Sequence, residues 1–73
     1  MDISEAARTL RHMYVTAPAK EKALSIHLFA IRYADQIRHM SPRELVILAE
    51  LPESYSTEIR KGINLAKYVE PRK

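Results

Sequence analysis

The chain has 73 residues, no cysteine and a formal net charge of +3, and 47% of its residues are hydrophobic. A chain of this length is expected to form one domain, residues 1–73, and to bury only about 60% of the surface that its unfolded form exposes. Without cysteine, the sequence excludes disulfides and thiolate metal sites. The hydrophobic content is high enough for a packed core and argues against a disordered chain.

The ends and the polar residues of the sequence exclude several further classes. No apolar run approaches the 18 or so residues that a membrane span needs, and the polar, acidic start Met1–Glu5 is unlike a signal peptide. We therefore expect a cytoplasmic protein with no membrane partner. His12, His27 and His39 are too widely spaced for a His-x-x-x-His pair on one helix face, so we expect no metal and no cofactor.

The apolar spacing predicts an all-α fold, because no stretch alternates with the two-residue period of a strand. The first helix is expected over residues 3–15, with Asp2 or Ser4 as its N-cap, and Thr16-Ala17-Pro18 ends it. Its apolar residues fall on one face: Ile3, Ala7, Leu10, Met13 and Tyr14.

A long second helix is expected over residues 19–38, and it is apolar on two sides. One stripe consists of Ile26, Phe29, Ala30, Tyr33 and Ile37. The opposite stripe consists of Leu24, Leu28 and Ile31. We expect the first helix to cover this second stripe; the alternative is that the stripe, together with Ile47 of the next helix, binds a second copy of the chain or another protein.

The clearest local signal is Ser41-Pro42-Arg43-Glu44, which has the pattern of a capping box with proline at the first helical position. It predicts a third helix over residues 41–50. Leu51-Pro52-Glu53-Ser54 then breaks the helical pattern.

A last helix is expected over residues 54–69, with Pro71 helping to end it. Its buried face comprises Tyr55, Ile59, Gly62, Ile63, Ala66 and Val69. A glycine inside a helix costs about 1 kcal/mol relative to alanine, so Gly62 suggests that another helix approaches closely. Alternatively, Gly62 ends a short helix and a further one begins near Asn64. The prediction is a compact bundle of four helices, or of five in that alternative.

The opposite face of the last helix is polar and basic: Ser56, Thr57, Arg60, Lys61, Asn64, Lys67 and Tyr68. Arginine can bond guanine bidentately and asparagine can do so with adenine, while the other side chains bind phosphate oxygens. Two helices joined by a short break, the second with such a face, have the order of a helix-turn-helix, whose second helix enters the major groove. The sequence therefore predicts double-stranded DNA as the partner.

The segment from Leu51 to Gly62, with Leu65–Val69, resembles short bacterial helix-turn-helix-like domain proteins over roughly residues 23–70. Its most specific part is Glu58-Ile59-x-Lys61-Gly62-x-x-Leu65-Ala66. The resemblance implies a helical fold with a helix-turn-helix-like unit at about residues 41–69, and nucleic-acid binding. The turn departs from the general pattern at three positions, where glycine, a serine or threonine cap and a buried aliphatic residue are usual: Glu50, Pro52 and Ser56.

These features favour a small DNA-binding protein, a transcriptional regulator or accessory factor that acts as a homodimer. The alternative is a protein–protein interaction module, antitoxin-like or subunit-binding, with no nucleic-acid role. The sequence has no glycine-rich phosphate loop and no nucleophile–base pair at helical spacing, so we expect neither an enzyme nor a small-molecule substrate.

Overall fold

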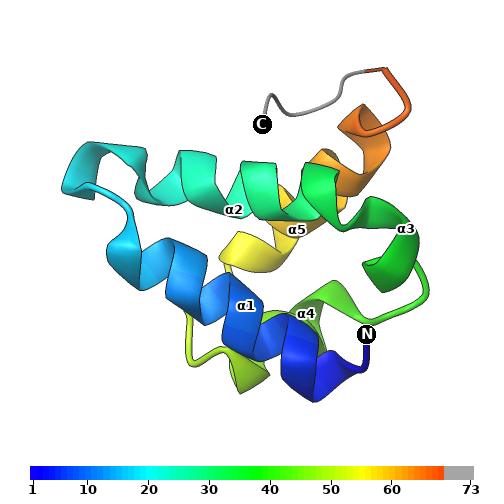
Figure 1. The fold of residues 1–73 in the computed structure, drawn as a ribbon, viewed down its shortest axis with the longest axis horizontal. Helices are drawn as coiled ribbons and strands as arrows, with labels where there is room; N and C mark the ends of the chain where they lie inside the picture. The colour runs from blue at the N-terminus through cyan, green and yellow to red at the C-terminus, as the bar shows by residue number, and fades with distance from the viewer. Residues whose placement is uncertain (69–73) are drawn as a thin grey trace.

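Helices dominate the computed structural model, which describes residues 1–68 (Figure 1). In chain order the elements are α1 (Ile3–Thr16), the 3-10 turn η1 (Ala19–Glu21), α2 (Lys22–Arg32), α3 (Ala34–Ile37), α4 (Pro42–Leu48) and α5 (Tyr55–Leu65). No strand occurs within residues 1–68, and the all-α prediction is confirmed.

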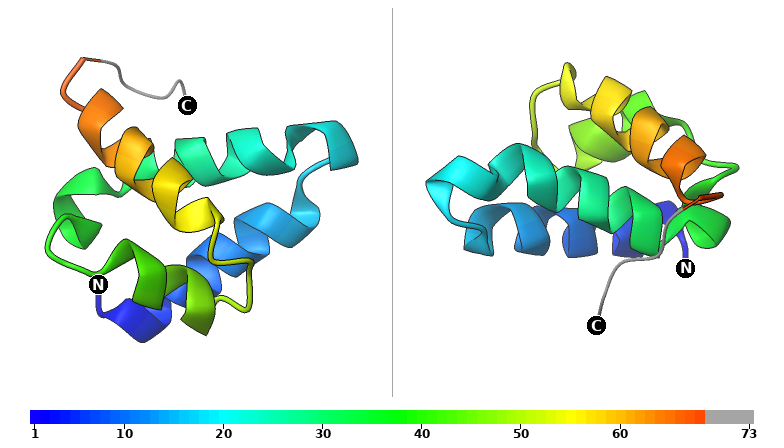
Figure 2. Two further views of the ribbon diagram at one scale, coloured as in Figure 1. Left: turned by 180° about the vertical axis from the view of Figure 1, so that it is seen from behind. Right: turned by 90° about the horizontal axis from the view of Figure 1, so that it is seen from above.

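The helix α2 occupies the middle of the bundle. It contacts α5 most extensively and also contacts α1, while α4 packs on both α1 and α5. Figure 2 shows α4 and α5 together on the rear side of the molecule, with α1 and α2 on the opposite side. The core between them contains large side chains that are fully buried: Leu10, Ile26, Phe29, Ile37, Leu45, Val46 and Ile59.

The predicted N-cap of α4 is confirmed, and of the two candidates for the N-cap of α1, Asp2 and Ser4, the structure selects Asp2. At α1, the Asp2 Oδ1 atom accepts a hydrogen bond of 2.8 Å from the Glu5 N–H. At α4, the Ser41 Oγ atom accepts from the Glu44 N–H at 3.3 Å, and Pro42 occupies the first turn. Each bond satisfies an N–H group that has no partner within its helix, which explains why both helices begin where the sequence indicates.

The expected continuous helix over residues 19–38 is wrong. Tyr33 (φ −107°, ψ 16°) leaves the helical conformation and separates α2 from α3. The N–H groups of Gln36 and Ile37 then bond to the Tyr33 carbonyl oxygen, so a new helix begins there. The apolar spacing continues across the break, since Ala34 and Ile37 are both buried, and periodicity therefore gives no sign of it.

The last helix is shorter than expected. It ends at Leu65 rather than near residue 69, and Val69 lies outside the described residues. Gly62 lies inside α5, which contradicts the alternative of a further helix starting near Asn64. A Cβ atom at Gly62 would lie 2.4 Å from the Ala30 Cβ atom and 3.1 Å from the His27 carbonyl oxygen. The close helix approach inferred from this glycine is therefore present, between α5 and α2.

The expectation that the first helix covers the second stripe of α2 is also wrong. Leu24 is 49% exposed and Leu28 is 38% exposed, with Ile31 half-buried beside them. The helix α1 packs on another side of α2, where the Lys22 Nζ atom bonds to the Tyr14 carbonyl oxygen. Two apolar sides were visible in the sequence, but their spacing does not show which side each neighbouring helix takes.

Candidate nucleic-acid interface

The connection between α4 and α5 runs through residues 49–54 and is longer than the expected four-residue break. Glu50 has φ 61°, and within residues 1–68 it is the only non-glycine residue with positive φ. The Leu51 N–H bonds to the Val46 carbonyl oxygen and the Glu50 N–H to that of Ile47, which is the Schellman pattern of helix termination. Glu50 thus adopts the left-handed conformation that the general helix-turn-helix pattern assigns to glycine.

Arg11 holds this turn against α1. Its Nη1 atom donates to the carbonyl oxygens of Ala49 at 3.0 Å and Glu50 at 3.5 Å. A cation at the C-terminus of a helix is favourable, because the last carbonyl oxygens carry partial negative charge. The sequence did not identify Arg11, since only the packing of α1 on α4 brings it to this helix end.

Two tyrosines position the start of α5. The hydroxyl groups of Tyr14 and Tyr55 lie 3.4 Å apart, and the two rings meet edge to face with centroids 5.5 Å apart. The hydrogen bond with Tyr14, together with burial, raises the pKa of Tyr55. The general helix-turn-helix pattern has a buried aliphatic residue at the position of Ser56. Here Tyr55, one position earlier, makes the contact and is half-buried, while Ser56 lies half-buried at the edge of the polar face.

The exposed face of α5 brings together most of the predicted site residues. Thr57, Arg60, Lys61 and Asn64 are exposed on the helix, opposite the buried Ile59 and Gly62. Lys67 and Tyr68, by contrast, lie in the turn after Leu65, so their expected helical placement is wrong. Tyr68 is 82% exposed. The α5 face is defined from here on as Ser56, Thr57, Arg60, Lys61 and Asn64.

The acidic residues near this face contact basic side chains. The Glu58 Oε2 atom contacts the His27 Nε2 atom of α2, and the Lys61 Nζ atom lies 4.0 Å from the other carboxylate oxygen. Glu53, just before α5, contacts the Arg43 Nε atom. Repulsion of phosphate by these two carboxylates is therefore reduced by their own partners. The sequence did not identify His27, because its contact depends on how α2 and α5 pack.

The possible partner surface predicted from the sequence divides into two separate areas. Leu24, Leu28 and Ile31 lie on α2. Ile47 lies on α4 next to Leu48, and these two side chains are 49% and 48% exposed. Since α4 packs on α1 and α5 rather than on α2, Ile47 does not extend the α2 stripe, and this part of the prediction is corrected.

Two other kinds of site are absent from the described part of the chain. Residues 1–68 contain no group of three or more histidine or acidic side chains that could hold a metal ion. None of the helices between residues 1 and 68 is both long enough and apolar enough to span a bilayer.

In a comparison with known protein families, the model of a family described as HTH-like domain aligns with residues 2–72. The match extends the resemblance seen in the sequence to α1, which contacts the α4–α5 turn through Arg11. Neither the curated proteins nor the solved structures contain a match.

Proposed function

We propose that this chain, which belongs to the HTH-like domain family, binds double-stranded DNA through the α5 face. The observation that carries the proposal is the composition of that face. Arg60, Lys61 and Asn64 project from one side of a helix, and the only carboxylate of α5, Glu58, is held at its border by His27. A role as transcriptional regulator or accessory factor is part of the same proposal.

The chemistry of these side chains fits a duplex. Arg60 has the planar donor pair that bonds guanine in the major groove, and Asn64 has the donor and acceptor that bond adenine. Lys61 and Thr57 suit phosphate oxygens, which position the helix without reading sequence. Lys67 follows the end of α5 and extends the positive charge along the same end of the molecule.

The test measures duplex binding by fluorescence anisotropy over a series of salt concentrations. We expect Arg60→Ala to weaken binding to the preferred sequence by about 1–3 kcal/mol, the range for a bidentate base contact. Lys61→Ala should weaken binding to all duplexes alike and lower the slope of log affinity against log salt by about 0.9, as for one lost phosphate contact. Circular dichroism should show the wild-type helical signal for both variants.

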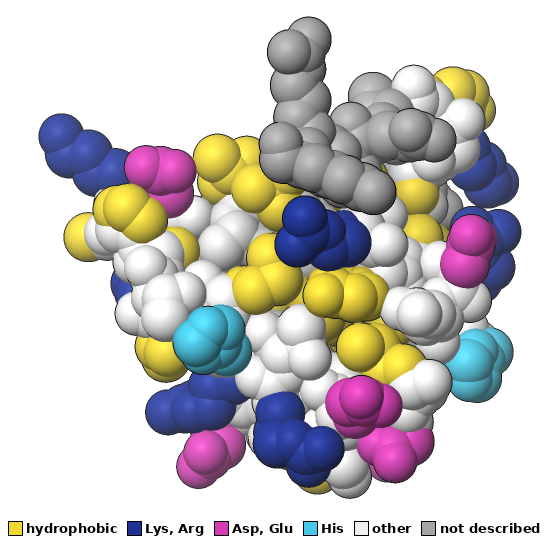
Figure 3. Space-filling view, in the orientation of Figure 1, with side chains coloured by type: hydrophobic (Ala, Val, Ile, Leu, Met, Phe, Trp, Pro, Cys, Tyr) yellow, Lys and Arg dark blue, Asp and Glu magenta, His cyan; other side chains and the backbone are white. Residues whose placement is uncertain are grey.

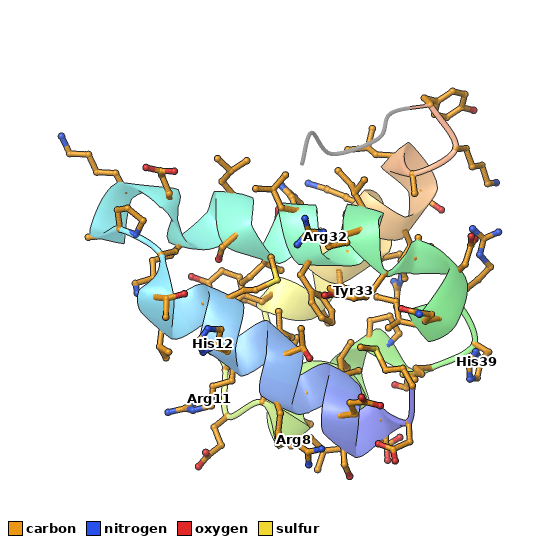
Figure 4. The ribbon with its side chains drawn as sticks, viewed as in Figure 1. Arg8, Arg11, His12, Arg32, Tyr33 and His39 are labelled. Atoms are coloured by element: carbon orange, nitrogen blue, oxygen red, sulfur yellow. The ribbon has the colours of Figure 1, made fainter. Side chains whose placement is uncertain are left out.

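Arg8 provides the matched control. It is an exposed arginine on α1, and Arg8→Ala changes the net charge as Arg60→Ala does. Figure 4 shows Arg8 on the front side of the molecule, whereas α5 runs along the rear. An equal loss of affinity in the two variants would show that net charge, not the α5 face, attracts DNA. Absence of binding by the wild-type protein at low salt would contradict the proposed function itself.

A second candidate function is recognition of another protein through α4. Ile47 and Leu48 are both about half exposed on adjacent positions of this helix, next to the turn that leads to α5. Neighbouring exposed aliphatic side chains are typical of protein-binding surfaces. Under this alternative the α5 face is a solvated surface, and Leu48→Glu rather than Arg60→Ala removes binding of the partner.

A further inference from the structure

The outer side of α2 carries an apolar seam that none of the helices within residues 1–68 covers. It consists of Leu24, Leu28 and Ile31, of which the two leucines are 49% and 38% exposed. Their separations of four and three residues are those of the a and d positions by which one helix packs on another. In the orientation of Figure 3, apolar side chains gather over α2 around one exposed cation, which Figure 4 labels as Arg32.

Two opposite charges lie along one flank of this seam. Glu21 directly precedes α2 and Arg32 is its last residue. Glu21 is the N-cap of α2, and eleven residues, about three turns of helix, separate it from Arg32, which places the two positions on the same flank of the helix. Both are exposed, and within residues 1–68 neither takes part in an ion pair.

We propose that the seam of α2 packs antiparallel against the seam of a second copy of this chain. In that arrangement Leu24 faces the partner's Ile31, and the two Leu28 side chains meet near the two-fold axis. Glu21 then lies near the partner's Arg32, and the same pair repeats on the other side of the axis. A parallel two-fold arrangement would exchange the flanks, so Glu21 and Arg32 of the two copies would lie on opposite sides of the seam and form no pair between copies. Only the antiparallel arrangement brings opposite charges together.

The same symmetry determines where the two α5 helices lie. In each copy α5 packs on the flank of α2 opposite to Glu21 and Arg32, through His27 and Ala30. Figure 4 shows Arg32 on the front of α2, and Figure 2 shows α5 behind it. The two-fold axis of an antiparallel pair of α2 helices runs perpendicular to them. Rotation about this axis exchanges the two ends of the pair but leaves each flank on its own side. Both α5 faces therefore point to the same side of the dimer, where one duplex can meet both.

The first test uses sedimentation equilibrium without DNA, so its outcome is independent of the proposed function. The wild-type chain should be dimeric at concentrations on the order of 100 µM. Leu28→Glu should raise the dimer dissociation constant by about a hundredfold or more, since it places unpaired charges at the centre of the seam. Leu48→Glu is the matched control on the α4 surface and should leave the constant unchanged.

The second test exchanges the flanking charges at exposed positions that the fold does not need. Glu21→Arg and Arg32→Glu should each weaken the dimer by about tenfold, because each sets like charges together at two symmetric places. The double variant Glu21→Arg/Arg32→Glu restores opposite charges and should recover the wild-type constant within about threefold. This recovery is specific to the antiparallel register, and it decides the proposal even if Leu28→Glu unfolds the chain.

Three results would overturn the proposal. The first is a wild-type chain that stays monomeric over the whole concentration range. A loss of dimer in Leu48→Glu but not in Leu28→Glu assigns the interface to α4. Additive weakening in the double charge variant, with no recovery, rules out contact between Glu21 and the partner's Arg32.

Discussion

Glu50 is held in a backbone conformation that suits glycine better, because its φ of 61° brings the Cβ atom close to the carbonyl group of the preceding residue, Ala49. Such a conformation costs about 1–2 kcal/mol for a residue other than glycine, and the extra freedom of glycine in the unfolded chain offsets part of that cost. We therefore expect Glu50→Gly to raise the free energy of unfolding by about 0.5–1 kcal/mol in urea denaturation.

Glu50→Ala separates the backbone from the side chain at this position. Alanine keeps the unfavourable φ and also removes the exposed contact between the Glu50 carboxylate and Arg11, whose atoms lie 3.9 Å apart. Because exposed ion pairs contribute little, this variant should equal the wild type or be slightly less stable. Equal stability of the glycine and alanine variants would contradict backbone strain as the cause.

The roles of single residues could be predicted from the sequence where these roles depend on near neighbours in the chain. Asp2 and Ser41 bond to N–H groups three positions later, and the cap pattern is visible without any knowledge of the fold. The residues of the candidate site that depend on distant contacts could not be predicted. Arg11 reaches the turn from α1, and His27 reaches Glu58 from α2, so both require the packing of helices to be known.

Among the elements, the crossing of α2 and α5 depends on Gly62. An added Cβ atom would lie 2.4 Å from the Ala30 Cβ atom, a short side chain that cannot turn away. Gly62→Ala gains about 1 kcal/mol of helix propensity but must push the two helices apart, which costs about 1–3 kcal/mol. We expect a net loss of about 1 kcal/mol in the free energy of unfolding, measured by urea denaturation.

Asn64→Ala is the control for the propensity effect, since Asn64 is exposed on the same helix. It should leave stability unchanged or raise it by a few tenths of a kcal/mol. Ala30→Gly should partly rescue Gly62→Ala, because it removes the atom with which the new side chain collides. If Gly62→Ala stabilises the protein as much as Asn64→Ala does, the helices are not in the close contact described.

The elements also show where sequence patterns stop being informative. The limits of α1 and the start of α4 follow from caps and prolines close to them in the chain. The break at Tyr33 does not, because buried positions continue through it with helical spacing. The exposure of Leu24 and Leu28 could not be predicted either, since two apolar stripes are compatible with several placements of α1 around α2.

For the whole molecule, the two proposals together predict a dependence of affinity on duplex length. A dimer with both α5 faces on one side can contact two half-sites about ten base pairs apart, whereas a monomer contacts one. The wild-type chain should therefore bind a duplex of about 24 base pairs much more tightly than one of about 12, because its second contact is intramolecular. Fluorescence anisotropy at one fixed low salt concentration measures both affinities.

Leu28→Glu should remove this dependence on length without removing DNA binding itself, because Leu28 lies on α2, away from the α5 face. The affinity of Leu28→Glu for the short duplex should match that of the wild type. Its affinity for the long duplex should exceed this value only by the statistical factor for the larger number of binding positions. Leu48→Glu should keep the wild-type behaviour on both duplexes. Equal losses on short and long duplexes in Leu28→Glu would mean that this residue contacts DNA or supports α5, rather than joining two copies of the chain.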